Sequence, residues 1–226
     1  MADDAALYRL LTWLSPAYPV GAYAYSHGLE DAVERGIACD GRGVCRYVAA
    51  VLQSGAGRSD GVLFAAAYRA AAADAADDLA AVAELAAAWR ATAEIALEAG
   101  AQGQAFLSVT RRAWSHPMLD ALARLPYPPS LPVVVAVAAA AHDASLPQAL
   151  LAYLHAFAAN LVSAAVRLVP LGQGEGQQVI AALEDTVRAA RDLALTTPLD
   201  EVGAAAGVIE LCSMRHETQY TRLFRS

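Results

Sequence analysis

The chain has 226 residues, of which 57% are hydrophobic, only 7% are aromatic and about a quarter are alanine. Since alanine is the best helix former and the apolar content is high, this composition excludes a disordered chain and favours an all-helical protein. The formal net charge of −7 argues against nucleic-acid binding, and all 16 basic residues are arginine. The absence of lysine excludes Schiff-base chemistry and phosphate-binding loops of the Gly-Lys-Ser/Thr type.

The first predicted helix begins at a cap, Asp3 or Asp4, and ends at residues 15–16. Its apolar face is defined by four leucines at the i, i+3, i+4, i+7 spacing: Leu7, Leu10, Leu11 and Leu14. Residues 15–25 hold two prolines and a glycine, so we expect an ordered connection without helix there.

The rest of the chain is predicted to be helix after helix. A short one, capped by Ser26, runs through Arg35, and the others are expected at roughly 43–55, 60–74, 78–99, 102–115, 117–125, 132–143, 147–169, 174–195 and 199–213. Asp60 is expected as a cap, and Gly55 and Gly100 as helix ends. First-turn positions suit three prolines: Pro117, Pro132 and Pro147.

These elements predict an all-α fold, a single-domain bundle of about ten helices without a β-sheet. The sequence shows no flexible linker that would divide it. We expect residues 1–213 to form the helical domain and residues 214–226 to form a tail that binds a partner.

Targeting signals and cysteines indicate a cytoplasmic protein. The acidic start of the chain is unlike a signal peptide. Residues 147–169 are long enough to cross a membrane, but they include Gln148, His155, Asn160 and Arg167, so we interpret them as a helix buried in protein. The three cysteines form no Cys-x-x-Cys pair, which makes a disulfide framework improbable.

Residue chemistry gives weak support for an enzyme. No two of the five histidines lie at i, i+3 or i+4, so we predict no metal site, although a weak contact at the loop with Cys39 and Cys45 stays open. Residues 171–177 resemble a phosphate loop but follow a helix, so we interpret them as a turn.

Ser26 and His27 are adjacent and would not face each other on a helix. A helical hydrolase using them with a carboxylate, and a carrier of apolar ligands with a large closed cavity, remain alternatives.

Two segments are unusual in this composition. Tyr18, Tyr23 and Tyr25 lie together in the proline- and glycine-containing connection, where they suit either an interface or the filling of a gap between helices. Residues 213–226 are basic and aromatic in an acidic chain. We expect this tail not to pack on its own chain but to dock in an acidic groove of a partner.

Both segments carry a resemblance to a known family. Residues 14–30, LSPAYPVGAYAYSHGLE, closely resemble the N-terminal signature of the UreF family of urease accessory proteins. Residues 215–226, RHETQYTRLFRS, are similar to that family's C-terminus, and residues 166–173 to a third family segment. The three matches come in the family's order. Within the signature, the positions singled out are Pro19, Gly21, Tyr23, Tyr25, Ser26, Gly28 and Glu30.

The resemblance implies an all-α scaffold without a catalytic centre, which dimerises, binds the accessory protein UreD (also called UreH) and recruits the GTPase UreG. UreG then delivers nickel to apo-urease, so nickel is handled by the complex and no cofactor or metal is held stably by this chain. No nucleic acid or membrane is expected as a partner. The residues expected to contact UreD are Tyr220, Arg222, Leu223, Phe224 and Arg225.

Arg167 is expected to lie on the surface that contacts UreG or on the surface that forms the dimer. Residues 91–94 lack the arginine that the family often has there, so no role is transferred to that helix. One further alternative is activation of the GTPase, with Arg222 or Arg225 as an arginine finger.

Overall fold

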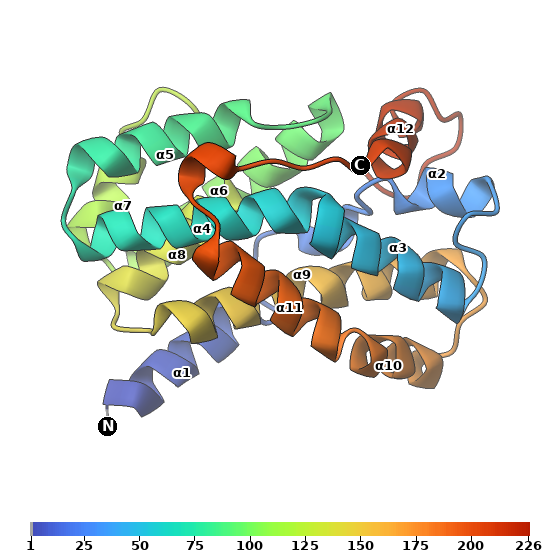
Figure 1. The fold of residues 1–226 in the computed structure, drawn as a ribbon, viewed down its shortest axis with the longest axis horizontal. Helices are drawn as coiled ribbons and strands as arrows, with labels where there is room; N and C mark the ends of the chain where they lie inside the picture. The colour runs from blue at the N-terminus through green and yellow to red at the C-terminus, as the bar shows by residue number, and fades with distance from the viewer. Residues whose placement is uncertain (1) are drawn as a thin grey trace.

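The computed structural model describes residues 2–226, and this part of the chain folds into helices with no strand (Figure 1). The predicted all-α fold is therefore confirmed. The α-helices are α1 (Ala2–Trp13), α2 (Leu29–Glu34), α3 (Gly41–Ser54), α4 (Ala56–Ala72), α5 (Ala76–Ala88), α6 (Ala93–Ala113), α7 (Pro117–Leu122), α8 (Leu131–Ala141), α9 (Leu146–Leu168), α10 (Gln173–Ala182), α11 (Glu184–Thr196) and α12 (Gly207–His216). Two 3₁₀ helices, η1 (Ala22–Ala24) and η2 (Leu199–Glu201), complete the set.

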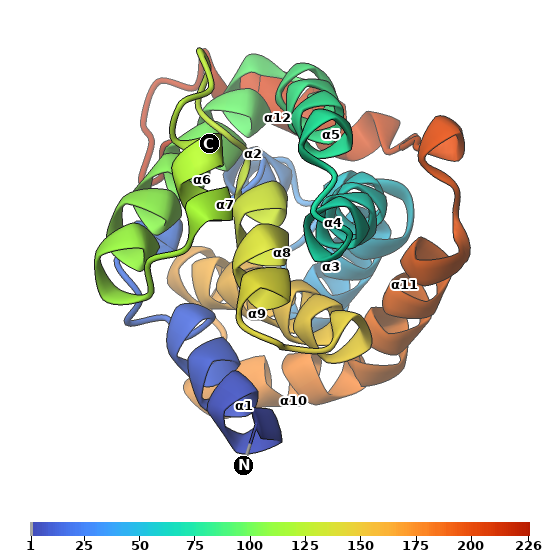
Figure 2. The same cartoon turned by 90° about the vertical axis from the view of Figure 1, so that its left-hand side faces the viewer.

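The core is centred on α8, which packs against α4, α6, α7 and α9. Residues 132–139 of α8 are all buried, and its sequence is apolar on every side, as expected of a helix surrounded by others (Figure 2). Alanines such as Ala67 on α4 and Ala136 on α8 are fully buried, so small side chains let these helices lie close together.

Helix starts follow the predicted proline signals but not all of the predicted caps. Pro117, Pro132 and Pro147 occupy the first turns of α7, α8 and α9, as expected. Asp60 is not a cap, because α4 begins at residue 56 and Asp60 lies inside it. Its carboxylate is buried and forms an ion pair with Arg90 at 2.6 Å. The two expected caps of α1, Asp3 and Asp4, likewise fall inside that helix.

The predicted break at Gly100 is wrong, because α6 is continuous from residue 93 to 113. The predicted helix is instead interrupted between Ala88, where α5 ends, and Ala93, where α6 begins. Thr92 caps α6 by accepting a hydrogen bond from the backbone N–H of Ile95 at 3.2 Å. Glycine has a packing role in α6: a Cβ at Gly103 would lie 2.0 Å from the carbonyl oxygen of Pro129. The helix therefore keeps glycine because the connection to α8 crosses it at backbone distance.

Three other boundaries differ from the prediction. Residues 174–195 form two helices, α10 and α11, that meet at Leu183. Within 199–213, only the part from residue 207 belongs to α12. The helix expected after Ser26 begins at Leu29 with Gly28 as its N-cap residue, while the Ser26 hydroxyl accepts a hydrogen bond from the N–H of Glu30 in the first turn at 3.4 Å.

The leucine face predicted for α1 is only partly buried. Leu10 and Trp13 are buried, and the Trp13 ring contacts those of Phe106, Trp114 and His142. Leu7 and Leu11 are exposed, on a helix that projects from the body of the protein (Figure 2).

One helix among the described residues, α9, is long and apolar enough to cross a membrane by length and composition alone. Half of its most apolar window is buried inside the fold. It packs against α3, α4, α8, α10 and α11.

Candidate functional site

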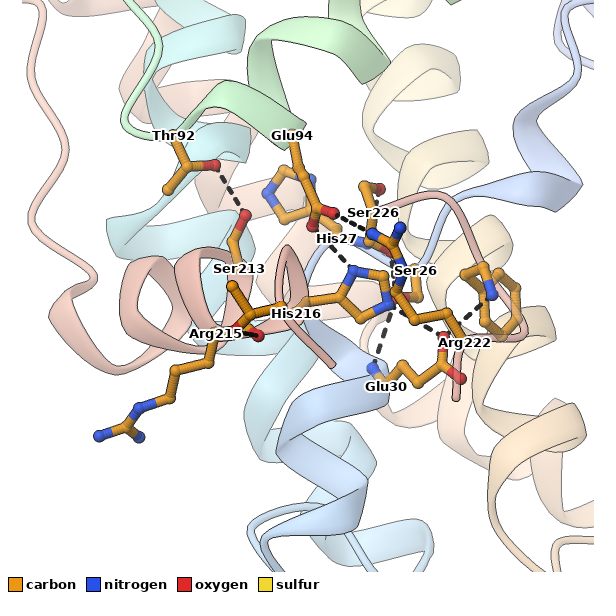
Figure 3. Close-up of polar contacts among 12 residues, drawn as sticks. Ser26, His27, Glu30, Thr92, Glu94, Ser213, Arg215, His216, Arg222 and Ser226 are labelled. Carbon is orange, nitrogen blue, oxygen red and sulfur yellow. Dashed lines mark hydrogen bonds and ion pairs between the residues drawn. The ribbon is translucent and has the colours of Figure 1, made fainter. Parts of the chain in front are cut away.

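The tail, residues 214–226, begins with the last turn of α12. Its remaining residues fold back onto the loop between α1 and α2, residues 14–28 (Figure 3). We expected it not to pack on its own chain, and this is wrong: Phe224 is 4% exposed and Ser226 is fully buried. The loop, the start of α2 and the first turns of α6 contact the end of the tail. We call this region the loop–tail site, with Ser26, His27, Glu30, Glu94, Glu98, His216, Arg222, Phe224 and Ser226 as its members.

Glu30, on the first turn of α2, holds the backbone of the tail. Its Oε1 accepts a hydrogen bond from the N–H of Leu223 at 2.7 Å, and its Oε2 accepts one from the N–H of Phe224 at 2.9 Å. The same Oε2 lies 3.0 Å from Nε2 of His216. Because this carboxylate is buried, its charge is stabilised by these donors rather than by water.

His216 joins Glu30 to a second carboxylate. The ring is fully buried, and its Nδ1 lies 2.8 Å from Oε2 of Glu94 on α6. The other oxygen of Glu94 accepts a hydrogen bond from Nη1 of Arg222 at 3.0 Å. Glu30, His216, Glu94 and Arg222 thus form one chain of charged contacts that connects α2, α6, α12 and the tail. A ring that carries both hydrogens donates to both carboxylates.

Ser226 makes the second set of contacts. Its main-chain oxygen accepts hydrogen bonds from the N–H of Ser26 at 2.9 Å and from the Ser26 hydroxyl. Its own hydroxyl donates to Oε2 of Glu98 at 2.9 Å, and that oxygen also lies 3.3 Å from Nδ1 of His27. The N–H of Arg225 donates to the carbonyl of Ala24 at 2.8 Å. The last two residues of the tail, Arg225 and Ser226, are thereby bound to the loop.

The loop is fixed in shape by left-handed backbone conformations at Gly21, His27 and Gly28. At Gly28 a Cβ would lie 2.9 Å from the backbone nitrogen of Ser213, so glycine lets α2 approach α12. Below the loop, the Tyr47 hydroxyl donates to the carbonyl of His27 at 2.9 Å. Burial raises the pKa of Tyr47 well above its usual value, which keeps this donor protonated.

The three loop tyrosines have different surroundings. Tyr18 and Tyr25 are buried, and the Tyr18 hydroxyl lies 2.8 Å from Oγ1 of Thr110 on α6. Tyr23 is 72% exposed, and Pro19 is exposed as well. Two of the rings therefore fill a gap between helices, and Tyr23 is the ring that stays exposed, so the interface account stays a prediction for Tyr23.

The expected partner residues divide in the same way. Tyr220 is fully exposed and Leu223 is 62% exposed, whereas Phe224 is buried. The Arg225 guanidinium lies 5.6 Å from the centre of the Tyr25 ring. Tyr220 and Leu223 can meet another protein directly, while Phe224 and Arg225 hold the tail in place.

Arg167, on the last turn of α9, lies against the tail. Its guanidinium is 4.3 Å from the centre of the Phe224 ring, a cation–π distance. Partial burial lowers its pKa from the usual value. In this arrangement Arg167 covers Phe224 and helps to keep it buried.

The geometry does not favour a hydrolase centred on Ser26. This side chain is fully buried, and its hydroxyl donates to Ser226, while the ring of His27 faces Glu98. A nucleophile would need to be reachable and bonded to its base.

Metal, phosphate and apolar ligands are no better supported. Among the side chains that the structure describes, residues 4–226, there is no group of three that could hold a metal ion, and burial raises the pKa of the Cys212 thiol to about 11. The phosphate-like segment is occupied by its own carboxylate, since Glu175 accepts a hydrogen bond from the N–H of Gly172 at 2.9 Å. Two mainly apolar cavities, of about 180 Å³ against α5 and α7 and about 330 Å³ between α9, α10 and α11, are both open to solvent, so neither is the closed cavity that a carrier was expected to have.

Sequence reasoning identified the loop and the tail but missed the residues that join them: Glu94, Glu98 and His216. No role was transferred to the helix containing Glu94, and His216 was considered only as a possible metal ligand. One signal was present in the sequence. Glu94, Glu98 and Gln102 follow the i, i+4, i+8 spacing of one helical face, and all three are buried.

Comparisons with known proteins agree on one family. The family model UreF matches residues 38–184. The urease accessory protein UreF of Granulibacter bethesdensis is 54% identical over 224 residues, which cover 99% of this chain and 95% of that protein. Proteins of the same name from Rhodopseudomonas palustris and a Bradyrhizobium species are 50% and 47% identical, again over nearly the full length of both chains.

Proposed function

This chain belongs to the UreF family of urease accessory proteins, and we propose that it is a non-catalytic scaffold for urease maturation. In this proposal it binds UreD (UreH) through the loop–tail site and recruits the GTPase UreG, which delivers nickel to apo-urease. It acts in the cytoplasm as a homodimer, and nickel is handled by the complex.

One observation carries the proposal: three exposed side chains with large apolar parts lie on the loop and the tail, next to the loop–tail site that fixes the backbone of both segments. Tyr23, Tyr220 and Leu223 are exposed at 72%, 103% and 62%. They lie on segments that the Arg225–Ala24 and Leu223–Glu30 hydrogen bonds hold together. Tyrosine is enriched among residues that dominate binding energy, and a backbone ordered before binding loses less entropy on association.

The test is co-purification with UreD, comparing the full chain with the double variant Tyr220→Ala/Leu223→Ala. Both side chains are exposed, so we expect the variant to keep the circular dichroism and melting temperature of the wild type and to bind UreD at least about tenfold more weakly. Leu193→Ala, at an exposed leucine on α11, is the matched control. Equal binding by the double variant and the wild type would place the UreD contact elsewhere.

Point variants are preferable to removal of the whole tail. A chain truncated after Ser213 would lack His216, Leu223 and Phe224 and would leave the buried carboxylates of Glu30 and Glu94 without their donors. Lost binding by the truncated chain would then reflect a damaged fold as well as a missing contact.

Two parts of the proposal have their own measurements. Light scattering at high protein concentration should show a dimer, and a monomer would contradict that part.

Hydrolysis of GTP by UreG should not depend on Arg222 of this chain, because its guanidinium forms an ion pair with Glu94. Stimulated hydrolysis that Arg222→Ala abolishes would instead favour the arginine-finger alternative.

A further inference from the structure

A cavity of about 360 Å³ lies beside the loop–tail site and shares His27 with it. It is enclosed by the start of α4, the break between α5 and α6, and the segment that leads into α12. His27, Ser59, Arg90, Ile95 and Glu210 are among the residues that line it. Trp89 also lines it and is 43% exposed, so the cavity can be reached from solvent.

A smaller cavity of about 30 Å³ adjoins it and has His27, Ala56, Arg90 and Ile95 in common with it. His27 and Arg90 are therefore the two polar side chains that line both cavities.

Two buried nitrogen atoms in this wall have no hydrogen-bond partner among the described residues. They are Nε2 of His27, whose residue is 3% exposed, and Nη2 of Arg90, whose side chain is 4% exposed. A buried polar atom that loses water without gaining a partner is unfavourable, so such atoms are uncommon in folded proteins. Two at the same cavity indicate that the cavity receives a polar ligand.

Arg90 is held so that one part of its guanidinium remains available. Its Nη1 forms an ion pair with Asp60 at 2.6 Å, and its Nε donates to the carbonyl of Ala86 at 2.9 Å. Asp60 accepts a further hydrogen bond from the Tyr153 hydroxyl at 3.1 Å. These contacts fix the plane of the guanidinium, and its remaining N–H groups, on Nη2, are left to donate to a ligand.

His27 is held from the opposite side. Its Nδ1 faces Oε2 of Glu98, and since an ionised carboxylate can only accept, Nδ1 carries a hydrogen. Glu98 also accepts from Ser226 and Gln102, so its negative charge has three donors. The neutral ring then offers the lone pair of Nε2 as an acceptor, and the charged ring offers an N–H donor.

From these two groups we propose that the cavity binds a small planar oxyanion of the bicarbonate and carboxylate class. Such an ion accepts from the guanidinium of Arg90 through one oxygen and meets Nε2 of His27 through another. Bicarbonate carries both an acceptor oxygen and an O–H, so it matches even a neutral His27. Arg90 is paired with Asp60, and Glu98 and Glu210 also line the two cavities, so the ion is bound through hydrogen bonds to the two unpartnered nitrogens and not through net charge. This inference goes beyond the scaffold role and does not depend on it.

The experiment follows the ring nitrogens of His27 by NMR in the full chain labelled with ¹⁵N-histidine. The protein is titrated with sodium bicarbonate, sodium acetate or sodium chloride at constant pH 8 and constant ionic strength. We expect a saturable shift of the His27 Nε2 signal with bicarbonate and none with chloride. Stronger binding of bicarbonate than of acetate indicates a neutral His27 that accepts the O–H, and equal binding indicates a charged ring; both support the proposal.

His27→Asn is the test variant, because asparagine tolerates the left-handed backbone at this position. Its amide nitrogen can face Glu98 as Nδ1 does, while nothing replaces Nε2. Binding of ¹³C-bicarbonate, measured by line broadening, should weaken at least tenfold in this variant and remain unchanged in His155→Asn, at an exposed histidine on α9. No shift with either oxyanion, the same shift with chloride, or undiminished bicarbonate binding by folded His27→Asn would overturn the proposal.

Discussion

The centre of the bundle is stabilised by apolar packing, whereas the loop–tail site is stabilised by hydrogen bonds between buried charged groups. Residues 132–139 of α8 are buried and apolar, and they touch neighbouring helices through small side chains. At the loop–tail site, five ionisable side chains are buried instead: His27, Glu30, Glu94, Glu98 and His216. The first region is specified by volume, since any apolar side chain of the right size would fit. The second is specified by hydrogen-bond direction, since each carboxylate oxygen must meet a donor.

The largest effect is expected from adding volume where backbones touch. Gly103→Ala places a Cβ 2.0 Å from the carbonyl oxygen of Pro129, and because that neighbour is backbone it cannot rotate away. We expect a loss of about 3 kcal/mol in unfolding free energy, or no folded protein, in urea denaturation. Gly174→Ala in α10 is the control, because nothing lies within 4 Å of its new methyl group. A Gly103→Ala variant as stable as Gly174→Ala would contradict the account of the core.

The next effect comes from changing hydrogen-bond direction without changing volume. Glu30→Gln keeps the size of the side chain but turns one acceptor into an NH₂ group that faces donors. We expect a loss of about 2–3 kcal/mol in unfolding free energy and release of the tail. Limited digestion with trypsin should then cleave after Arg222 and Arg225 much faster than in the wild type. Wild-type stability together with wild-type cleavage would show that Glu30 does not hold the tail.

Reactivity of the cysteines sharpens the comparison further. Cys212 on α12 is 1% exposed, and burial, followed by the hydrogen bond to Asp31, raises its pKa to about 11, so at pH 8 about one thiol in a thousand is ionised. Alkylation by iodoacetamide should be at least about a hundredfold slower at Cys212 than at the exposed Cys39. Mass spectrometry of the labelled peptides gives both rates. Comparable rates at the two cysteines would mean that α12 opens readily.

The smallest expected effect is on the pH dependence of stability, through His142 at the end of α8. Burial, and to a smaller extent Arg9 and His116, lowers the pKa of His142 below 6.5, while its bond to the Trp114 carbonyl acts in the opposite direction. Above pH 6.5 both the folded and the unfolded forms are neutral, so this residue makes no pH-dependent contribution. As the pH falls below 6.5 the unfolded chain takes up the proton first, and stability decreases.

His142→Gln isolates this contribution, because its amide can donate to the Trp114 carbonyl in place of Nε2. The melting temperature of the variant should fall less than that of the wild type between pH 7.5 and 5.5. An equal fall in both proteins would assign the pH dependence to other groups.

Features that depend on neighbouring residues were predicted well from the sequence. The alanine-rich composition predicted the all-α fold, and Pro117, Pro132 and Pro147 marked helix starts, because a proline at the first turn acts locally. Gly103 and Asp60 were out of reach of such reasoning. Their roles depend on partners that are distant in sequence, the Pro129 carbonyl and Arg90.

The site was predicted in pieces. The loop and the tail were both singled out, each for its own composition, but their contact joins residues about 200 positions apart. The buried position of His216 depends on α2, α6 and α12 together, so no local pattern could reveal it. Phe224 was expected to face a partner and instead lies under Arg167, because the return of the tail depends on Glu30.

The separation between Glu30 and its partners also determines when the loop–tail site can form during synthesis. Glu30 leaves the ribosome early, whereas Leu223 follows 193 residues later. At about 5–20 residues per second, that interval is roughly 10 to 40 s. Throughout it, the helices can assemble while the loop still lacks the segment that covers it. The exposed Tyr220 and Leu223 take their places beside the loop only after this interval, so a chain that still lacks them does not display the surface proposed for binding a partner.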